Sequence, residues 1–104
     1  MDNVSQDVSQ ALSRRFLQDF PSDAALQLER MSVEDLLAPL SEQPVEVLAP
    51  VWSRLVPRFA ATLTLLLPTL TADELLTQLA PNVAVRILSQ MTDEQVSLVL
   101  ERLD

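Results

Sequence analysis

Apolar residues recur at intervals of three and four positions along most of the chain. One such run covers residues 47–55, a second covers 56–70, and two more cover 83–91 and 96–103. This spacing gathers apolar side chains on one face of an α-helix. The pattern predicts helices over residues 3–19, 22–31, 33–40, 44–56, 58–67, 72–79, 82–90 and 93–103.

Hydroxyl residues mark the expected start of some of these helices. Each stands three positions before an acidic residue or Gln, so that its oxygen accepts a hydrogen bond from a free backbone N–H of the first turn. The two pairs that begin with Thr fit the full capping box, whereas Ser32 has an Asp three positions later and fits a weaker variant. The pairs are Ser32 with Asp35, Thr71 with Glu74, and Thr92 with Gln95.

Prolines mark further helix starts in the same pattern. Pro21, Pro44, Pro57 and Pro81 each stand near a predicted helix start, where the missing N–H of proline costs nothing. Pro50 differs, because the apolar pattern continues on both sides of it. Either the helix over 44–56 bends at Pro50, or a new short helix begins there.

The chain contains an internal repeat. Residues 21–40 align with residues 81–100 at an offset of 60 without a gap, and residues 70–76 (LTADELL) resemble residues 31–37 (MSVEDLL). Helices this short are marginal alone, so packing against neighbours must hold them, and stacked helical hairpins are the usual arrangement. The identities are Pro21/Pro81, Ala24/Ala84, Leu28/Leu88, Met31/Met91, Glu34/Glu94 and Leu40/Leu100.

These features predict an all-α fold. The absence of Gly disfavours tight β-hairpin turns, aromatic residues are scarce, and the abundant Leu favours helix. We expect one domain over residues 1–104, an α-solenoid-like stack of short helices and helical hairpins. An N-terminal helix would occupy residues 1–19 and the repeat stack residues 20–104.

The composition removes most catalytic chemistry. The chain has no His, no Cys and no Gly. Without His and Cys it lacks the common nucleophile–base pairs, disulfides and N/S zinc ligands. Without Gly it cannot form a P-loop or a dinucleotide-binding fingerprint. Because only carboxylates and Arg remain for proton transfer, we expect a protein that is not an enzyme.

The charge balance restricts the partners. The chain carries 15 acidic and 7 basic residues, a formal net charge of −8. Such a field repels phosphate backbones and anionic lipids, so we do not expect nucleic acid as a partner. With 48% hydrophobic residues, the chain is too apolar for a disordered acidic tail, so it should fold.

No segment has the pattern of a membrane span or a secretory signal. The longest apolar stretch, residues 59–70, includes Pro68 and is shorter than the roughly 18 residues that a bilayer span needs. The first ten residues carry Asp2 and Asp7 and lack a basic start with an apolar core. We therefore expect no membrane insertion by this chain and a cytoplasmic location.

Two segments resemble a known family. Residues 20–37 (FPSDAALQLERMSVEDLL) and residues 80–96 (APNVAVRILSQMTDEQV) are similar to the intracellular N-terminal domain of MgtE-type magnesium transporters. The resemblance covers roughly residues 20–104 and departs from the family's pattern over residues 41–54, which contain the additional Pro44 and Pro50. It implies a right-handed superhelical stack of short helices. That stack also resembles the middle domain of the flagellar motor switch protein FliG, a protein-interaction module.

The resemblance implies a cytosolic regulatory domain that senses intracellular Mg²⁺. In such transporters this domain precedes paired CBS domains and a membrane channel, and Mg²⁺ draws the acidic surfaces of the two cytosolic domains together. The implied partners are thus CBS domains and a membrane domain, in the same or another chain. We expect either a piece of a longer protein, which the end at the close of a helix slightly favours, or a free-standing domain. The alternative is a FliG-like adaptor that binds a protein without metal dependence.

Carboxylates on the last predicted helix are the candidate Mg²⁺ ligands. Asp93, Glu94, Glu101 and Asp104 fall on or beside one broad face of that helix. Mg²⁺ keeps most of its waters and takes one or two carboxylates, so binding here would be weak and regulatory. The structural alternative is a solvated helix face, on which Asp93 and Glu94 only complement the helix dipole.

Trp52 and Phe16 are the candidate interface residues. Trp52 is the single Trp, and aromatic residues anchor many interfaces, but it also lies in register with neighbouring apolar positions, as a core residue would. Phe16 belongs to the apolar stripe of the first predicted helix. That helix either covers the open end of the stack or docks on a partner or a second copy of the chain, so a homodimer is a further candidate assembly.

Overall fold

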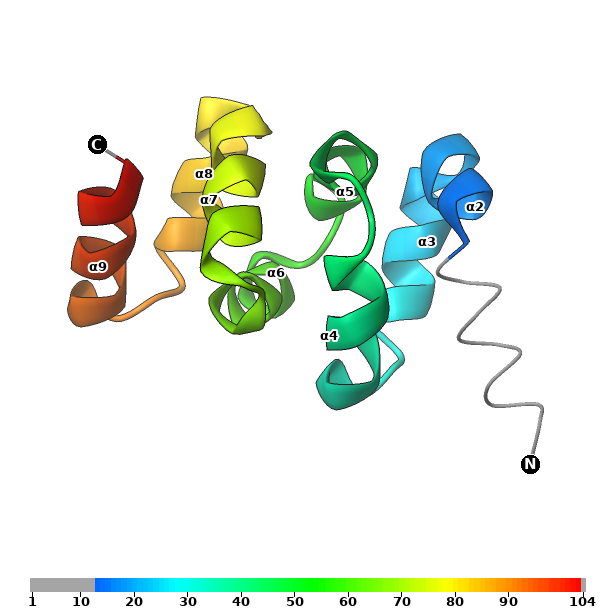
Figure 1. Cartoon of the computed structure of the whole chain (residues 1–104), viewed down its shortest axis with the longest axis horizontal. Coiled ribbons are helices and arrows are strands. Elements are labelled where there is room, and N and C mark those ends of the chain that lie inside the picture. The colour runs from blue at the N-terminus through cyan, green and yellow to red at the C-terminus, as the bar shows by residue number, and fades with distance from the viewer. Residues whose placement is uncertain (1–12, 104) are drawn as a thin grey trace.

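The computed structural model describes residues 13–103, and this part of the chain is helical throughout, without strands (Figure 1). The all-α prediction is confirmed. Each predicted helix has a counterpart at its place in the chain, although residues 3–12 of the first one lie outside the described part. The helices are α2 (Arg14–Asp19), α3 (Pro21–Leu28), α4 (Val33–Ser41), α5 (Val45–Trp52), α6 (Pro57–Leu66), α7 (Thr69–Gln78), α8 (Pro81–Leu88) and α9 (Asp93–Leu103).

The helices follow one another along the longest axis of a body that measures 42 × 24 × 21 Å (Figure 1). From α3 onward, each helix packs on the helix two places further along, so that α3 packs on α5, α4 on α6, α5 on α7, α6 on α8 and α7 on α9. In addition, α2 packs on α3 and α5. The stack of short helices is therefore present, and its right-handed superhelical twist stays a prediction.

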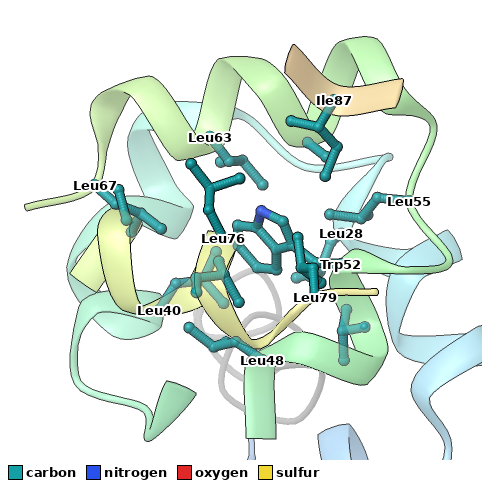
Figure 2. Packing of buried hydrophobic residues seen from close by; sticks show 14 of the residues in the cluster. Leu28, Leu40, Leu48, Trp52, Leu55, Leu63, Leu67, Leu76, Leu79 and Ile87 are labelled. Carbon is teal, nitrogen blue, oxygen red and sulfur yellow. The ribbon is translucent and has the colours of Figure 1, made fainter. Parts of the chain in front are cut away.

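The core runs along the stack with Trp52 near its middle. The Trp52 side chain is 1% exposed, and Figure 2 shows it among aliphatic side chains from α3, α5, α6, α7 and α8. Because every one of these helices contributes, burial of apolar surface along the stack supplies the stability that helices this short lack alone. The largest fully buried side chains are Trp52, Leu17, Leu28, Leu36, Leu40, Leu48, Leu63, Leu75, Ile87, Val51 and Val99.

Several predicted helix starts are confirmed. The Thr92 N–H donates to Gln95 Oε1 at 2.9 Å and the Gln95 N–H donates to Thr92 Oγ1 at 3.2 Å, which is the reciprocal capping box expected there. Pro21, Pro57 and Pro81 are the first residues of α3, α6 and α8. At these positions the missing N–H removes no helical hydrogen bond.

Two other predicted capping boxes are wrong. Helix α7 begins at Thr69, directly after Pro68, so Thr71 lies inside the helix and does not cap it. Ser32 does precede α4, but its hydroxyl donates to the Glu34 carboxylate and makes no capping hydrogen bond. A neighbour outside the predicted pair explains each error. Pro68 sets the start of α7 ahead of Thr71, and the Glu34 carboxylate accepts the hydrogen bond of the Ser32 hydroxyl.

Of the predicted helix over residues 3–19, the structure describes residues 13–19, and Ser13 is not helical. This residue is extended, with φ −66° and ψ 141°, and its hydroxyl oxygen accepts the Phe16 N–H at 3.2 Å. Such a conformation and bond define an N-cap, so α2 begins at Arg14. The apolar pattern continues across Ser13, so periodicity alone does not indicate that a helix begins at Arg14.

Helix α5 passes through Pro50 and no new helix begins there. It ends at Trp52, four residues earlier than predicted, because the chain turns over residues 53–56 before α6. The Arg54 side chain reaches back, and its Nη1 donates to the Pro50 carbonyl at 2.8 Å. Pro39 likewise lies inside α4.

The internal repeat has a structural counterpart. Helices α3 and α8 span equivalent residues at an offset of 60, and α4 and α9 begin at the equivalent residues Val33 and Asp93. The two copies therefore place equivalent residues at equivalent turns of their helices.

The Ser32–Glu34 contact predicts a measurable titration. The Ser32 hydroxyl and, to a smaller extent, a backbone hydrogen bond hold the pKa of Glu34 below its ordinary value. Because this folded-state pKa is depressed, the associated stabilisation is present above the unfolded-state pKa and is lost as the pH falls through the folded-state pKa. We expect Ser32→Ala to raise the pKa of Glu34, measured by carboxyl ¹³C NMR. Ser41→Ala, which removes a hydroxyl bound to the Leu37 carbonyl, should not change it. An unaltered Glu34 titration in Ser32→Ala would contradict the assignment.

Candidate functional site

The predicted metal residues lie along α9. Asp93 and Glu94 form its first turn, Glu101 lies near its other end, and all are exposed. Asp104 lies outside the described residues. An α-helix rises about 1.5 Å per residue, so Asp93 and Glu101 are separated by about 12 Å along the axis. Within residues 13–103, no group of three potential ligands is close enough together to hold a metal ion.

The structure therefore spreads these carboxylates over a surface and does not gather them in one preformed site. None of Asp93, Glu94 and Glu101 forms an ion pair with another described residue. Two carboxylates in the first turn favourably complement the helix dipole. Exposed, separated carboxylates suit contact with a hydrated cation, or apposition to a second charged surface, better than direct chelation.

An ion pair attaches α9 to α7. Arg102 Nη2 lies 3.1 Å from Asp73 Oδ1, and Arg102 Nε donates to both carboxylate oxygens, at 3.1 and 3.3 Å. Sequence reasoning missed this pairing. The two residues are 29 positions apart, and no local pattern reports that α7 and α9 are neighbours.

The predicted interface residues lie in different environments. Phe16 is half-buried, and its ring centroid lies 5.8 Å from that of the exposed Phe20, so an aromatic surface does exist on α2. Trp52 is buried in the core, which is the position its register favoured. Its side chain is therefore not available for an interface on the folded domain.

Trp52 is held by a buried hydrogen-bond chain that sequence reasoning missed. Its indole Nε1–H donates to Thr64 Oγ1 at 2.9 Å, and the Thr64 hydroxyl donates to the Ala60 carbonyl at 2.7 Å. Thr64 is the one buried polar residue among residues 13–103. Its signal in the sequence was a lone hydroxyl at a core-facing position, four residues after Ala60 and three before Leu67.

No family model, no curated protein and no solved structure matches this chain. Across residues 13–103, no helix is long and apolar enough to cross a membrane.

Proposed function

We propose that this domain is a cytosolic regulatory domain of a Mg²⁺ or related divalent-cation transporter. The observation that carries the proposal is the pair of segments over residues 20–37 and 80–96, which resemble the N-terminal domain of MgtE-type transporters. These segments form the equivalent helix pairs α3–α4 and α8–α9. The exposed carboxylates on α9 add a surface of the expected charge.

The proposed mechanism is electrostatic. At low Mg²⁺, the carboxylates of α9 repel an acidic surface of a partner domain, such as a CBS domain in the same or another chain. At high Mg²⁺, hydrated ions bridge the two surfaces, because Mg²⁺ keeps several waters and accepts one or two carboxylates. The ion then shifts an equilibrium between two domain arrangements by its differential affinity for them.

A backbone-amide NMR titration tests the metal response of this chain. We expect millimolar Mg²⁺, at constant ionic strength, to cause saturable shifts clustered on residues 93–104. Equal concentrations of Ca²⁺ and a matched monovalent salt distinguish a Mg²⁺ response from general screening. Shifts that do not saturate, or that the monovalent salt reproduces, would overturn the sensing role for this chain.

Two charge-matched variants locate the response. The triple variant Asp93→Asn, Glu94→Gln and Glu101→Gln should abolish the saturable shifts. The quadruple variant that also contains Asp104→Asn should likewise lack them. The control triple variant should retain them. It changes the same residue types at exposed positions on α3, directly after α4 and on α5, and two of its residues also stand in first turns. Its substitutions are Asp23→Asn, Glu42→Gln and Glu46→Gln.

The second candidate is an adaptor that binds a protein through an apolar surface and ignores metal. Exposed apolar side chains on α8 and α9, among them Val85 and Leu100, favour it. The two functions differ in one measurable property, because an adaptor binds its partner equally well with Mg²⁺ and with a chelator.

A further inference from the structure

The two copies of the repeat differ in which of their surfaces is covered. In α3 the side chains of Ala24, Ala25 and Leu28 are buried, and α5 packs on this helix. The equivalent residues of α8 are Ala84, Val85 and Leu88, of which Val85 is 63% exposed while its counterpart Ala25 is 2% exposed. Among residues 13–103, no helix follows α8 by two places, so none of them occupies the position that α5 takes on α3.

Helices α4 and α9 differ in the same way. Leu36 and Leu40 of α4 are buried, and α6 packs on this helix. Their counterparts on α9 are the half-buried Val96 and Leu100, which is 47% exposed. We call the surface made of Ala84, Val85, Leu88, Val96 and Leu100 the open face.

The side of α3 that is equivalent to the α6-facing side of α8 is polar. The side of α8 that faces back along the stack carries Val83 and the buried Ile87, which lies beside Leu63 of α6 in Figure 2. The equivalent positions on α3 are Asp23 and Gln27, and both are exposed. At these two positions α8 therefore carries apolar residues that are buried or half-buried, whereas α3 carries exposed polar residues.

The residues on and next to α3 that accept hydrogen bonds from the segment after α5 have counterparts on and next to α8. The segment after α5 is attached to α3 by Arg54 Nε, which donates to Ser22 Oγ at 2.9 Å, and by the Val56 N–H, which donates to Glu29 Oε2 at 2.7 Å. The counterparts of Ser22 and Glu29 are Asn82 and Ser89, which are exposed and carry oxygens that can accept hydrogen bonds. An incoming segment would thus find acceptors at both ends of α8.

Charge indicates which kind of segment fits. Asp93 stands one turn before Val96 and Glu101 directly follows Leu100, whereas Arg86 directly follows Val85, so two carboxylates and one guanidinium border the open face. A second copy is disfavoured because each copy has a net charge of −8. Like charges across an interface oppose association, whereas a basic border on the incoming helix complements it.

We propose that the open face binds an amphipathic helix of another protein, whose apolar stripe is bordered by Arg or Lys, and that this helix packs on α8 as α5 packs on α3. The interaction needs no metal ion, so its test stands apart from the Mg²⁺ titration. The mode is that of a helix laid on an apolar groove, with anchors spaced by one helical turn.

The probe is a synthetic peptide based on α5, because α5 packs on the equivalent helix α3. A basic peptide consists of residues 44–56 with Glu46→Arg and blocked termini, and an acidic peptide consists of the same residues with Arg54→Glu. In buffer with EDTA, we expect the basic peptide to cause saturable amide shifts on α8 and α9 of the full chain. The acidic peptide should bind at least about tenfold more weakly.

Matched variants of the chain test the location. Val85→Asp and Leu100→Asp should each weaken the basic peptide at least about tenfold, because each places a charge among the apolar contacts. Leu98→Asp should not, although Leu98 is 58% exposed on the same helix, because it lies two residues, or about 200°, around the helix from Leu100.

Three outcomes would overturn the proposal. The basic peptide could fail to bind, it could shift residues of α3 by displacing α5, or the two peptides could bind equally well. Sedimentation equilibrium provides a fourth test. A dimer of the unliganded chain that Val85→Asp dissociates and Leu98→Asp preserves would make a second copy the occupant and would also contradict the proposal.

Discussion

Replacing Trp52 with Ala should lower the free energy of unfolding by about 3–5 kcal/mol, the range found when a large buried aromatic residue is truncated. Trp52 is 1% exposed and lies among aliphatic side chains from neighbouring helices (Figure 2). A domain of this size is stable by only about 5–15 kcal/mol, so the loss would be a large part of the total. Urea denaturation followed by far-UV circular dichroism measures it without relying on the indole signal.

Phe20→Ala provides the control, because Phe20 is aromatic but exposed. We expect that variant to lose less than about 1 kcal/mol, as surface substitutions usually do. A loss for Trp52→Ala as small as that of the control would contradict the central position of Trp52 in the core.

Thr64 separates the hydrogen-bonding part of this effect from the packing part. Thr64→Val keeps the shape of the side chain but leaves the Trp52 Nε1–H without its acceptor, and an unsatisfied buried donor costs about 1–3 kcal/mol. Thr64→Ser keeps the hydroxyl and removes one methyl group. In a Trp52→Phe background, which has no indole N–H, Thr64→Val should cost less than it does in the wild type.

Periodicity predicted the helices well because the information it uses is local. An apolar stripe every three to four residues identifies a helix whatever it packs against, and residues 93–103 were placed without error. Proline and Thr92 marked helix starts for an equally local reason. The errors at Ser13 and Thr71 arose where one local rule competed with another. At Thr71, for example, the preceding Pro68 allows the helix to begin at Thr69, three residues earlier than predicted.

The contacts between distant residues could not be predicted in this way. Arg102 pairs with Asp73 because α9 packs on α7, and the Trp52 indole meets Thr64 because α5 and α6 enclose one core. Neither follows from spacing along one helix. The candidate metal surface shows the same limit, since a helical wheel places Asp93 and Glu101 on related faces but ignores the axial rise that separates them.

Leu40 and Leu100 provide the most direct comparison of the two ends of the stack. They are the same residue type at equivalent positions of the repeat, yet Leu40 is fully buried while Leu100 is 47% exposed. Leu40→Ala should therefore lower the free energy of unfolding by about 2–5 kcal/mol, because it leaves a cavity beneath α6. Leu100→Ala should lower it by less than about 1 kcal/mol, since about half of that side chain already contacts water.

Equilibrium urea denaturation of both variants, at two protein concentrations at least tenfold apart, measures this difference. If Leu100→Ala were as costly as Leu40→Ala, Leu100 would have to be covered in solution. A concentration-dependent midpoint would then identify a second copy as the cover. A large difference, independent of concentration, means that the domain folds without a further segment covering Leu100. Its apolar side chain then adds little to the stability of the isolated domain, which leaves the open face free for a partner helix.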